Sequence, residues 1–373
     1  MKQKNLKEYV AGALRIAGIT INGNKPYDIR IRNDSFYQRV LAENTLGLGE
    51  SYMDRWWECD ALDELINRAL RFELTGHLKQ NISLVWHVLK SKIINLQKVS
   101  RAFQVGESHY NLGNDLFKAM LDEKMVYTCG YWKAADNLDD AQIAKLDLIC
   151  RKIELEPDMT VLDIGCGFGG FAAYAAEKYG ARVTGITVSK EQAKLAREKC
   201  EGLPVEIKLE DYRRTVGRYD RVISVGTFEH IGYKNYRTYM QQVSRLLVDD
   251  GIAFLHTIGG NNSTTTTNPW TAKYIFPNGM IPSIAQIGKA MEGLFIMEDW
   301  HNFGEYYDKT LMAWHANFKK SWPELKNKYS DRFYRMWEYY LLSCAGAFRA
   351  RTLQLWQIVM TKQGSRPSVQ RIS

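Results

Sequence analysis

The sequence predicts an α/β protein in which a doubly wound sheet domain follows a smaller, mixed N-terminal domain. From about residue 140 to 257, short apolar strands alternate with segments of helical periodicity. This alternation is typical of a parallel sheet that is covered by helices on both faces. A glycine-rich loop at 165–170 joins one of these strands to the helix that follows it. Residues 1–70 lack this alternation and predict a separate small unit.

The N-terminal region contains two candidate strands. Residues 19–21 predict a short strand before the turn at 22–26, and 28–32 alternate polar and apolar residues as a second strand would. We expect a small domain over residues 1–76 with a role in docking to lipid.

The segment 77–104 predicts a basic, amphipathic linker helix. Its basic residues, which include Lys90 and Arg101, are interspersed with apolar residues such as Trp86 and Leu89. Such a helix fits an anionic membrane surface. It equally fits a linker that packs on its own domain, and the sequence leaves both interpretations open.

The large domain is expected over residues 105–373, and its elements follow in order. Apolar residues at helical spacing predict a helix over 141–153 that ends at Pro157-Asp158. A second helix follows the glycine loop to about Tyr179. A third helix runs from Ser189 to Cys200. Ser189 and Gln192 together predict a capping box at its start. The expected strands are 160–164, 182–187, 205–209, 219–225 and 252–257.

Composition limits the partners. The chain has 373 residues and a formal net charge of +8, which suits nucleic acid, an anionic membrane surface or acidic small molecules. Nucleic acid is the weakest candidate, because there is no tight Lys/Arg run, zinc-ligand spacing or RNP-like motif. The six cysteines form no C-x-x-C pair, and no stretch approaches the length of a membrane span. We therefore expect a cytoplasmic protein that docks on the membrane surface.

The loop V-L-D-I-G-C-G-F-G-G, at 161–170, is the most informative segment. Gly165, Gly167 and Gly169 allow close approach of a ligand, and the next helix presents its N-terminal N–H groups. The glycines are spaced G-x-G-x-G, which differs from the G-x-G-x-x-G spacing typical of NAD-binding loops. Asp163 is placed to hold an ammonium group. The alternative is a tight turn that binds nothing.

This loop resembles the first motif of class I S-adenosylmethionine-dependent methyltransferases, which implies a Rossmann-like methyltransferase domain. Such enzymes often carry an acidic residue at the end of the second strand, for the ribose hydroxyls. Here the strand runs into T-V-S-K-E-Q, so the resemblance leaves that task to Thr187 and Gln192.

Nearly the whole chain resembles the bacterial cyclopropane-fatty-acyl-phospholipid synthase family. One departure is Asn111, where the family usually has Asp. The matching stretches are L-G-L-G-E-S-Y-M-D (46–54), W-W-E-C-D (56–60), H-Y-N-L-G-N-D-L-F (109–117), Y-T-C-G-Y-W (127–132), L-D-I-G-C-G (162–167), D-Y-R (211–213), F-E-H-I-G (228–232), L-H-T-I-G (255–259), Y-I-F-P-N-G (274–279) and L-Q-L-W-Q (353–357).

The resemblance implies methylene transfer from S-adenosylmethionine to the cis double bond of an unsaturated phospholipid acyl chain. An alkene is a poor nucleophile, and its attack on a methyl group leaves a carbocation that must lose a proton. The site should therefore exclude water and hold a base close by. In the family that base is a bound bicarbonate, and its positions map onto Cys129, Glu229, His256, the Ile258 backbone and Tyr307. Taken singly, His256 and Cys129 also suit an apolar core.

The resemblance implies further residues and partners. Cys344 resembles a cysteine sometimes assigned to the reaction, although methyl transfer to an alkene needs no thiolate, and lining the pocket is the alternative. The family also implies a homodimer, and no metal is expected. The implied cofactor contacts are Tyr127, Thr128, Asp163, Gly165, Gly167, Gly169, Thr187, Gln192, Asp211 and Tyr212.

Two alternatives remain open from the sequence. Relatives with similar motifs make methyl-branched acyl chains or methylate amines, and the residues separate these outcomes poorly. A non-catalytic lipid-binding protein with a vestigial cofactor fold is the other alternative, which the intact glycine loop and Glu229 disfavour.

Overall fold

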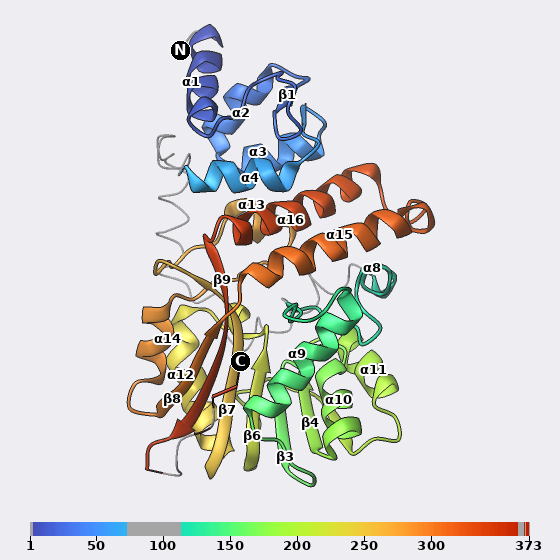
Figure 1. Ribbon diagram of the computed structural model, residues 1–373, viewed down its shortest axis with the longest axis vertical. Helices are drawn as coiled ribbons and strands as arrows, with labels where there is room; N and C mark the ends of the chain where they lie inside the picture. The colour runs from blue at the N-terminus through green and yellow to red at the C-terminus, as the bar shows by residue number, and fades with distance from the viewer. Residues whose placement is uncertain (1–2, 73–112, 365–368, 370, 373) are drawn as a thin grey trace. The chain divides into compact units, whose positions relative to one another are not determined.

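A computed structural model describes residues 3–72, 113–364, 369 and 371–372 (Figure 1). The expected linker helix over 77–104 and the Asn111 position lie outside the described residues. The described chain divides into two compact units. The first contains the N-terminal residues to Phe72 together with 265–277 and 307–353, and the second contains the remainder. The division is thus not linear in sequence, unlike the expected boundaries at 76 and 105.

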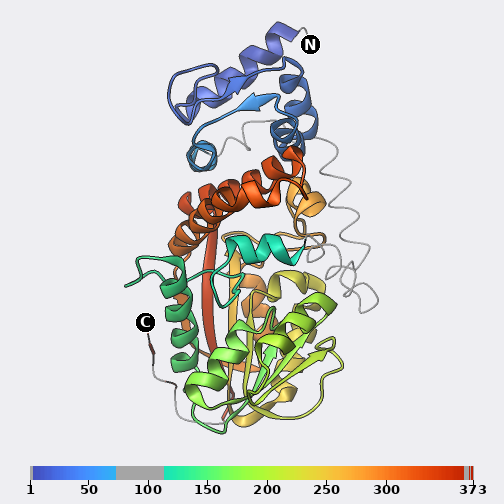
Figure 2. The ribbon, with the colours of Figure 1, turned by 90° about the vertical axis from the view of Figure 1, so that its right-hand side faces the viewer.

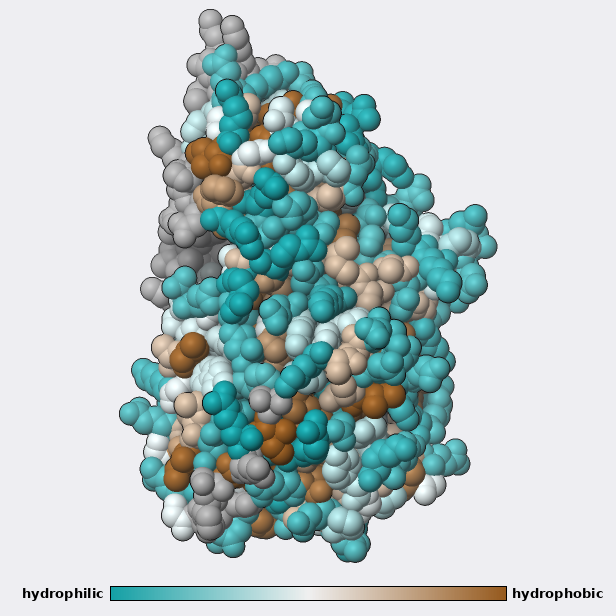
Figure 3. All heavy atoms as spheres, in the orientation of Figure 1, coloured by the Kyte–Doolittle hydropathy of each residue, from teal (hydrophilic) through white to brown (hydrophobic). Residues whose placement is uncertain are grey.

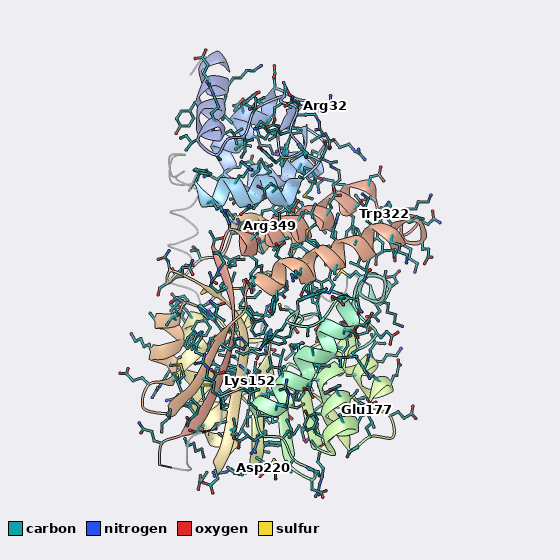
Figure 4. The ribbon with its side chains drawn as sticks, in the orientation of Figure 1. Arg32, Lys152, Glu177, Asp220, Trp322 and Arg349 are labelled. Carbon is teal, nitrogen blue, oxygen red and sulfur yellow. The ribbon has the colours of Figure 1, made fainter. Side chains whose placement is uncertain are left out.

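The first unit is mostly helical. Close packing joins α4 to α16, because Gly346 approaches the backbone of Asp63 so closely that a Cβ on it would lie 2.4 Å from the Asp63 carbonyl oxygen. Arg349, labelled in Figure 4, forms ion pairs with Asp63 at 2.7 Å and with Asp308 at 2.9 Å. The elements are α1 (Gln3–Ile16), β1 (Arg30–Ile31), α2 (Ser35–Glu43), α3 (Thr45–Met53), β2 (Trp57–Glu58), α4 (Leu62–Arg71), α13 (Pro269–Tyr274), α15 (Glu305–Leu325, from its third residue onward) and α16 (Asp331–Arg349).

The strand expected at 19–21 is wrong, since only an isolated bridge between Ile21 and Ile29 forms there. The carboxylate of Asp28 accepts hydrogen bonds from the backbone N–H groups of Thr20 and Lys25 at 2.8 and 2.9 Å. These bonds fold the segment into a turn, and β1 pairs instead with β2.

The second unit contains a seven-stranded sheet in the order β5-β4-β3-β6-β7-β9-β8, formed by its described residues. The five expected strands are confirmed and pair in parallel. The expectation of a parallel sheet is wrong at one edge, because β8 pairs antiparallel with β9. The strands are β3 (Thr160–Ile164), β4 (Arg182–Thr187), β5 (Val205–Leu209), β6 (Tyr219–Val225), β7 (Leu247–Gly260), β8 (Phe295–Asn302) and β9 (Leu353–Lys362, of which Leu353 belongs to the first unit).

Helices cover both faces of this sheet, as the two views in Figures 1 and 2 show. Alternate strand residues point to opposite faces. Val161 and Val183 face a core with α9, α10 and α11, whereas Leu162 and Val222 face a core with α12 and α14. The helical elements are α8 (Asn114–Met120), α9 (Leu138–Lys152), α10 (Gly170–Tyr179), α11 (Lys190–Lys199), α12 (Tyr236–Leu246), α14 (Ile284–Met291) and the short 3₁₀ turns η1 (Phe228–His230) and η2 (Tyr233–Asn235).

The helix expected over 141–153 is confirmed as α9, which begins earlier, at Leu138. α9 stops at Lys152, before Pro157, because Glu154 adopts a left-handed φ of 47° that turns the chain.

Surface chemistry is mixed on the face that Figure 3 shows, where hydrophilic residues prevail and hydrophobic ones are scattered among them. The exposed apolar side chains include Ile296 and Met297 on the edge strand β8. In the described part of the chain, no helix combines the length and apolar character that crossing a membrane requires.

Candidate functional site

A cavity of about 190 Å³ opens in the second unit, where the strand order reverses between β3 and β6. Ligands of doubly wound sheets bind at this position, beyond the carboxyl ends of the strands. Nine of the ten residues predicted to contact the cofactor line this cavity. They are Tyr127, Thr128, Asp163, Gly165, Gly167, Thr187, Gln192, Asp211 and Tyr212.

The three glycines of the loop have different roles. Gly165 has a φ of +81° and a Cβ on it would meet Thr227. Gly167 has a φ of +54°, and a Cβ on it would enter open space at the cavity wall. Gly169, the exception among the ten, instead packs on α11, since a Cβ there would lie 3.1 Å from the Cβ of Ala196. Gly167 therefore forms the part of the loop that is open to a ligand.

The end of β4 carries a polar pair in place of an acidic residue. The Thr187 hydroxyl donates to Oε1 of Gln192 over 2.8 Å, and both side chains are buried. Ser189 caps α11 by accepting from the backbone N–H of Gln192 at 3.3 Å. Only this half of the expected capping box forms, because the Gln192 side chain turns to Thr187 and the backbone N–H of Ser189 donates to the Thr187 hydroxyl.

Two buried groups of opposite charge line the cavity. Burial raises the pKa of Asp163 to about 7. Burial lowers the pKa of Lys145 to about 8, against the opposing effect of nearby acidic groups. The Lys145 ammonium donates to the hydroxyl of Thr128 over 2.8 Å. Sequence reasoning missed Lys145, because its spacing in α9 is that of any helical residue.

A buried glutamine also fixes the loop before the cavity. The side-chain amide of Gln142 donates to the carbonyls of Val126 and Thr128 at 3.3 and 2.8 Å. Sequence reasoning missed Gln142 too, since no motif marks a helix glutamine that bonds to a distant loop.

The adjoining edge of the cavity carries Asp211 and Tyr212. Arg213 forms an ion pair with Asp211 at 2.6 Å, and Asp211 is only 2% exposed. The ring of Tyr212 contacts that of Tyr239 at a centroid distance of 5.0 Å. Asp211 is thus already neutralised by its neighbour, and Tyr212 is held by packing.

Glu229 lies in η1, directly after β6, where it is buried. Its Oε1 accepts the backbone N–H of Ile258, on β7, at 2.7 Å, while its Oε2 is buried and has no hydrogen-bond partner among the described residues. Burial raises the pKa of Glu229 to about 7. The resemblance assigned the backbone N–H of Ile258 to bicarbonate, but in this structure that N–H donates to Glu229.

His256 lies two residues before Ile258 on β7 and is 1% exposed. Its Nδ1 lies 3.3 Å from Nε2 of Gln357, on β9. Since that amide nitrogen donates, Nδ1 accepts and the ring carries its hydrogen on Nε2. Nε2 is buried and has no partner in the part of the chain that the structure describes. Burial holds the pKa of His256 well below its ordinary value, so the ring is neutral. Gln357 was missed as a site residue, although it ends a matching motif.

Cys129 is fully buried and donates to the carbonyl of Gly130 at 3.2 Å. Thr128, directly before Cys129, lines the cavity. His230, directly after Glu229, lines the cavity as well. Cys129, Glu229, His256 and Ile258 do not line the cavity themselves. These residues of the second unit thus belong to segments that adjoin it.

Tyr307 and Cys344 belong to the first unit. The buried ring of Tyr307 packs against Phe348 at a centroid distance of 4.6 Å and against Trp314 at 5.9 Å. Burial raises the pKa of the Cys344 thiol to about 12. This thiol is therefore protonated near neutral pH, which disfavours a nucleophilic role.

The described residues contain no group of three or more His, Cys, Asp or Glu side chains that could hold a metal ion. The polar groups gathered at the cavity edge instead suit an organic ligand with both charged and hydroxyl groups.

Comparison with known proteins adds independent findings. The family model described as mycolic acid cyclopropane synthetase matches residues 97–358. Cyclopropane-fatty-acyl-phospholipid synthase of Escherichia coli K12 is 54% identical over 346 residues, which cover 93% of this chain and 91% of the relative. Sphingolipid C9-methyltransferase of Komagataella phaffii is 32% identical, with 90% and 74% covered. A mycolic acid cyclopropane synthase solved with S-adenosylhomocysteine has a TM-score of 0.66 and 31% identity, with 70% and 98% covered.

Proposed function

Because the chain belongs to the mycolic acid cyclopropane synthetase family, we propose that this S-adenosylmethionine-dependent methyltransferase acts on the cis double bonds of unsaturated phospholipid acyl chains, which it converts to cyclopropanes. The E. coli relative carries that substrate class in its name. The observation that carries the proposal is the buried carboxyl of Glu229, which has one oxygen fixed by Ile258 and the other without a partner within residues 3–72 and 113–364.

S-adenosylmethionine suits the cavity at the β3–β6 switch point. Gly167 leaves room where a Cβ would stand, and Asp163 offers a buried carboxylate to an ammonium group. Thr187 and Gln192 would hold the ribose hydroxyls, and Tyr127, Thr128, Gly165, Asp211 and Tyr212 would line the rest of the bound molecule. When bound, S-adenosylmethionine supplies a methyl group on a sulfonium that a weak nucleophile can attack.

Bicarbonate suits the polar groups beside this cavity. The Nε2–H of neutral His256 is a donor and Oε2 of Glu229 is an acceptor, and neither bonds to any other group that the structure describes. An anion with one hydroxyl needs both kinds of group. Glu229, His256, Cys129 and Ile258 of the second unit would hold bicarbonate, which would supply the base for the proton released from the transferred methyl. Ile258 contributes by orienting Glu229.

The test uses purified protein, S-adenosylmethionine and vesicles of unsaturated phospholipid. The acyl chains should gain the mass of one CH₂, and their NMR spectrum should show upfield ring protons. Unchanged acyl mass would overturn the proposal. Calorimetry with S-adenosylhomocysteine shows whether an inactive protein still has a working cofactor site. If S-adenosylhomocysteine does not bind, a non-catalytic lipid-binding protein is favoured.

A second candidate product is a methyl-branched acyl chain. It is favoured by the similarity to a sphingolipid C9-methyltransferase, whose name indicates methylation without ring closure. Mass alone does not separate the two outcomes, because methyl transfer followed by loss of a proton from the acyl chain gives a branched alkene with the same added CH₂ as the ring. The NMR spectrum separates them, since only the cyclopropane shows upfield ring protons. Methylation of an amine would leave the acyl mass unchanged and add a methyl group to the acceptor.

Membrane partners follow from the substrate. We infer that the protein associates peripherally with the inner face of the cytoplasmic membrane, supported by its net charge of +8. Flotation with anionic vesicles should weaken as salt rises, and insensitivity to salt and to anionic lipid would contradict the electrostatic part. A homodimer is proposed from the family alone, and sedimentation equilibrium tests it.

A further inference from the structure

Lys145 is a fully buried lysine that lines the cofactor cavity. It lies on α9, which packs against the sheet face opposite α12. A buried ammonium is costly unless it is paired. A second buried lysine of the same helix, Lys152, meets this requirement through an ion pair with Asp299 at 2.8 Å. Lys145 makes no ion pair within 4 Å in the described part of the chain, so its charge calls for another explanation.

The contact of Lys145 with Thr128 has a direction. An ammonium group only donates, so the Thr128 oxygen accepts over 2.8 Å and the hydroxyl hydrogen is left to donate elsewhere. Thr128 itself lines the cavity. Lys145 thereby presents a hydroxyl donor to a ligand and places a positive charge behind it, which is the arrangement that a carboxylate prefers.

The two carboxylates that act on the Lys145 charge, those of Asp122 and Asp163, differ in their other contacts. Asp122 accepts the backbone N–H groups of Val126 and Lys124 at 2.8 and 2.9 Å. Asp163 makes no hydrogen bond to Lys145 among the described residues, although its negative charge opposes the lowering of the Lys145 pKa that burial causes. The cavity therefore presents an ammonium and a carboxylate that are not bonded to each other.

We propose that Lys145 is a positioning residue that fixes the Thr128 hydroxyl as a donor, and that this pair, together with Asp163 in the lining of the same cavity, selects a ligand with a free amino-acid end. The ligand's carboxylate faces Thr128 and Lys145, and its ammonium faces Asp163. This inference rests on the proposed cofactor and assigns the part of the site that distinguishes S-adenosylmethionine from its decarboxylated form.

Calorimetry with S-adenosylhomocysteine and its decarboxylated analogue tests the assignment without turnover. The wild type should prefer the carboxylate-bearing ligand. Lys145→Met should weaken its binding roughly 10- to 100-fold, as expected for a lost bond to a charged group, and should leave binding of the analogue nearly unchanged. The ratio of the two affinities thus falls. Thr128→Val should lower the same ratio, and adding it to Lys145→Met should cause little further loss.

Lys152→Met is the matched control, because it removes a buried lysine from the same helix at a position that does not line the cavity (Figure 4). It should leave the affinity ratio unchanged. If Lys145→Met does not fold, Thr128→Val and Lys145→Arg decide the question, the latter retaining most of the ratio. Equal weakening of both ligands, or no change, would overturn the proposal. A wild type that binds neither ligand would instead remove the cofactor assignment on which it rests.

Discussion

The backbone N–H of Ile258 donates to Oε1 of Glu229 at 2.7 Å, and Oε2 of the same carboxyl is buried with no partner in the described chain. A buried acceptor of this kind costs free energy unless something occupies the space before it. Strand β7, which carries Ile258, also carries His256, whose Nε2 likewise has no partner among the residues described. Two unsatisfied groups of complementary type therefore support the anion that we propose at this position.

Glu229→Gln should reduce turnover by about 100-fold or more, the usual effect of removing a group that assists proton transfer. The amide preserves the shape and keeps an oxygen that accepts from Ile258, but it places an NH₂ donor where Oε2 stood, and this group cannot accept the hydroxyl of an anion. Binding of S-adenosylhomocysteine should be unchanged, because Glu229 does not line the cofactor cavity. Glu206→Gln, on β5, is the control and should retain full turnover.

Glu229→Gln should also alter how stability depends on pH. Burial raises the pKa of Glu229 from 4.5 to about 7, so the folded protein binds this proton more tightly than the unfolded chain. The associated stability is present below about pH 4.5 and is lost as pH rises to about 7, by at most about 1.4 kcal/mol per pH unit. Urea unfolding from pH 5 to 8 should show a smaller decline in the variant, and an equal decline would contradict the assignment.

Gln357→Leu should lower turnover about tenfold while cofactor affinity stays constant. Loss of the amide frees Nδ1 of His256, so the ring no longer holds its hydrogen on Nε2 in one tautomer. Gln354→Leu, on the same strand, removes bonds to Asn302 and Asn261 instead and serves as the control. Equal losses in both variants would indicate a general effect of β9.

Gly167→Ala and Gly165→Ala should separate ligand binding from folding. A methyl at Gly167 meets no protein atom but enters the cavity. Its left-handed φ costs about 1 kcal/mol, and S-adenosylhomocysteine binding should weaken more than stability does. A methyl at Gly165 meets Thr227, so thermal unfolding should fall further in that variant. The reverse order would contradict the placement of the cofactor.

Much of the sheet was predictable because its central strands are short apolar runs bounded by turns. The bounds of β3, β4, β5 and β6 agree with the expected ranges. β8 was not predicted, because as an edge strand it buries few side chains and lacks clear alternation. β9 follows a long helical segment that belongs to the other unit, so no local pattern links it to the sheet.

The candidate site was predictable where residue type and motif coincide, as at Gly167 and Glu229. It was not predictable where a side chain acts across the fold. Lys145 reaches a loop 17 residues earlier in the chain, and Gln357 reaches a strand 101 residues away. Such pairs depend on the packing of α9 and on the adjacency of β7 and β9, which the sequence does not display.

The most direct measurement is the isotope content of the acyl product formed with S-adenosylmethionine that carries a trideuterated methyl group. Ring closure removes one deuteron from the transferred methyl, so the product should gain CD₂. A product that retains all three deuterons, or an acyl chain without deuterium, would contradict methylene transfer to the double bond.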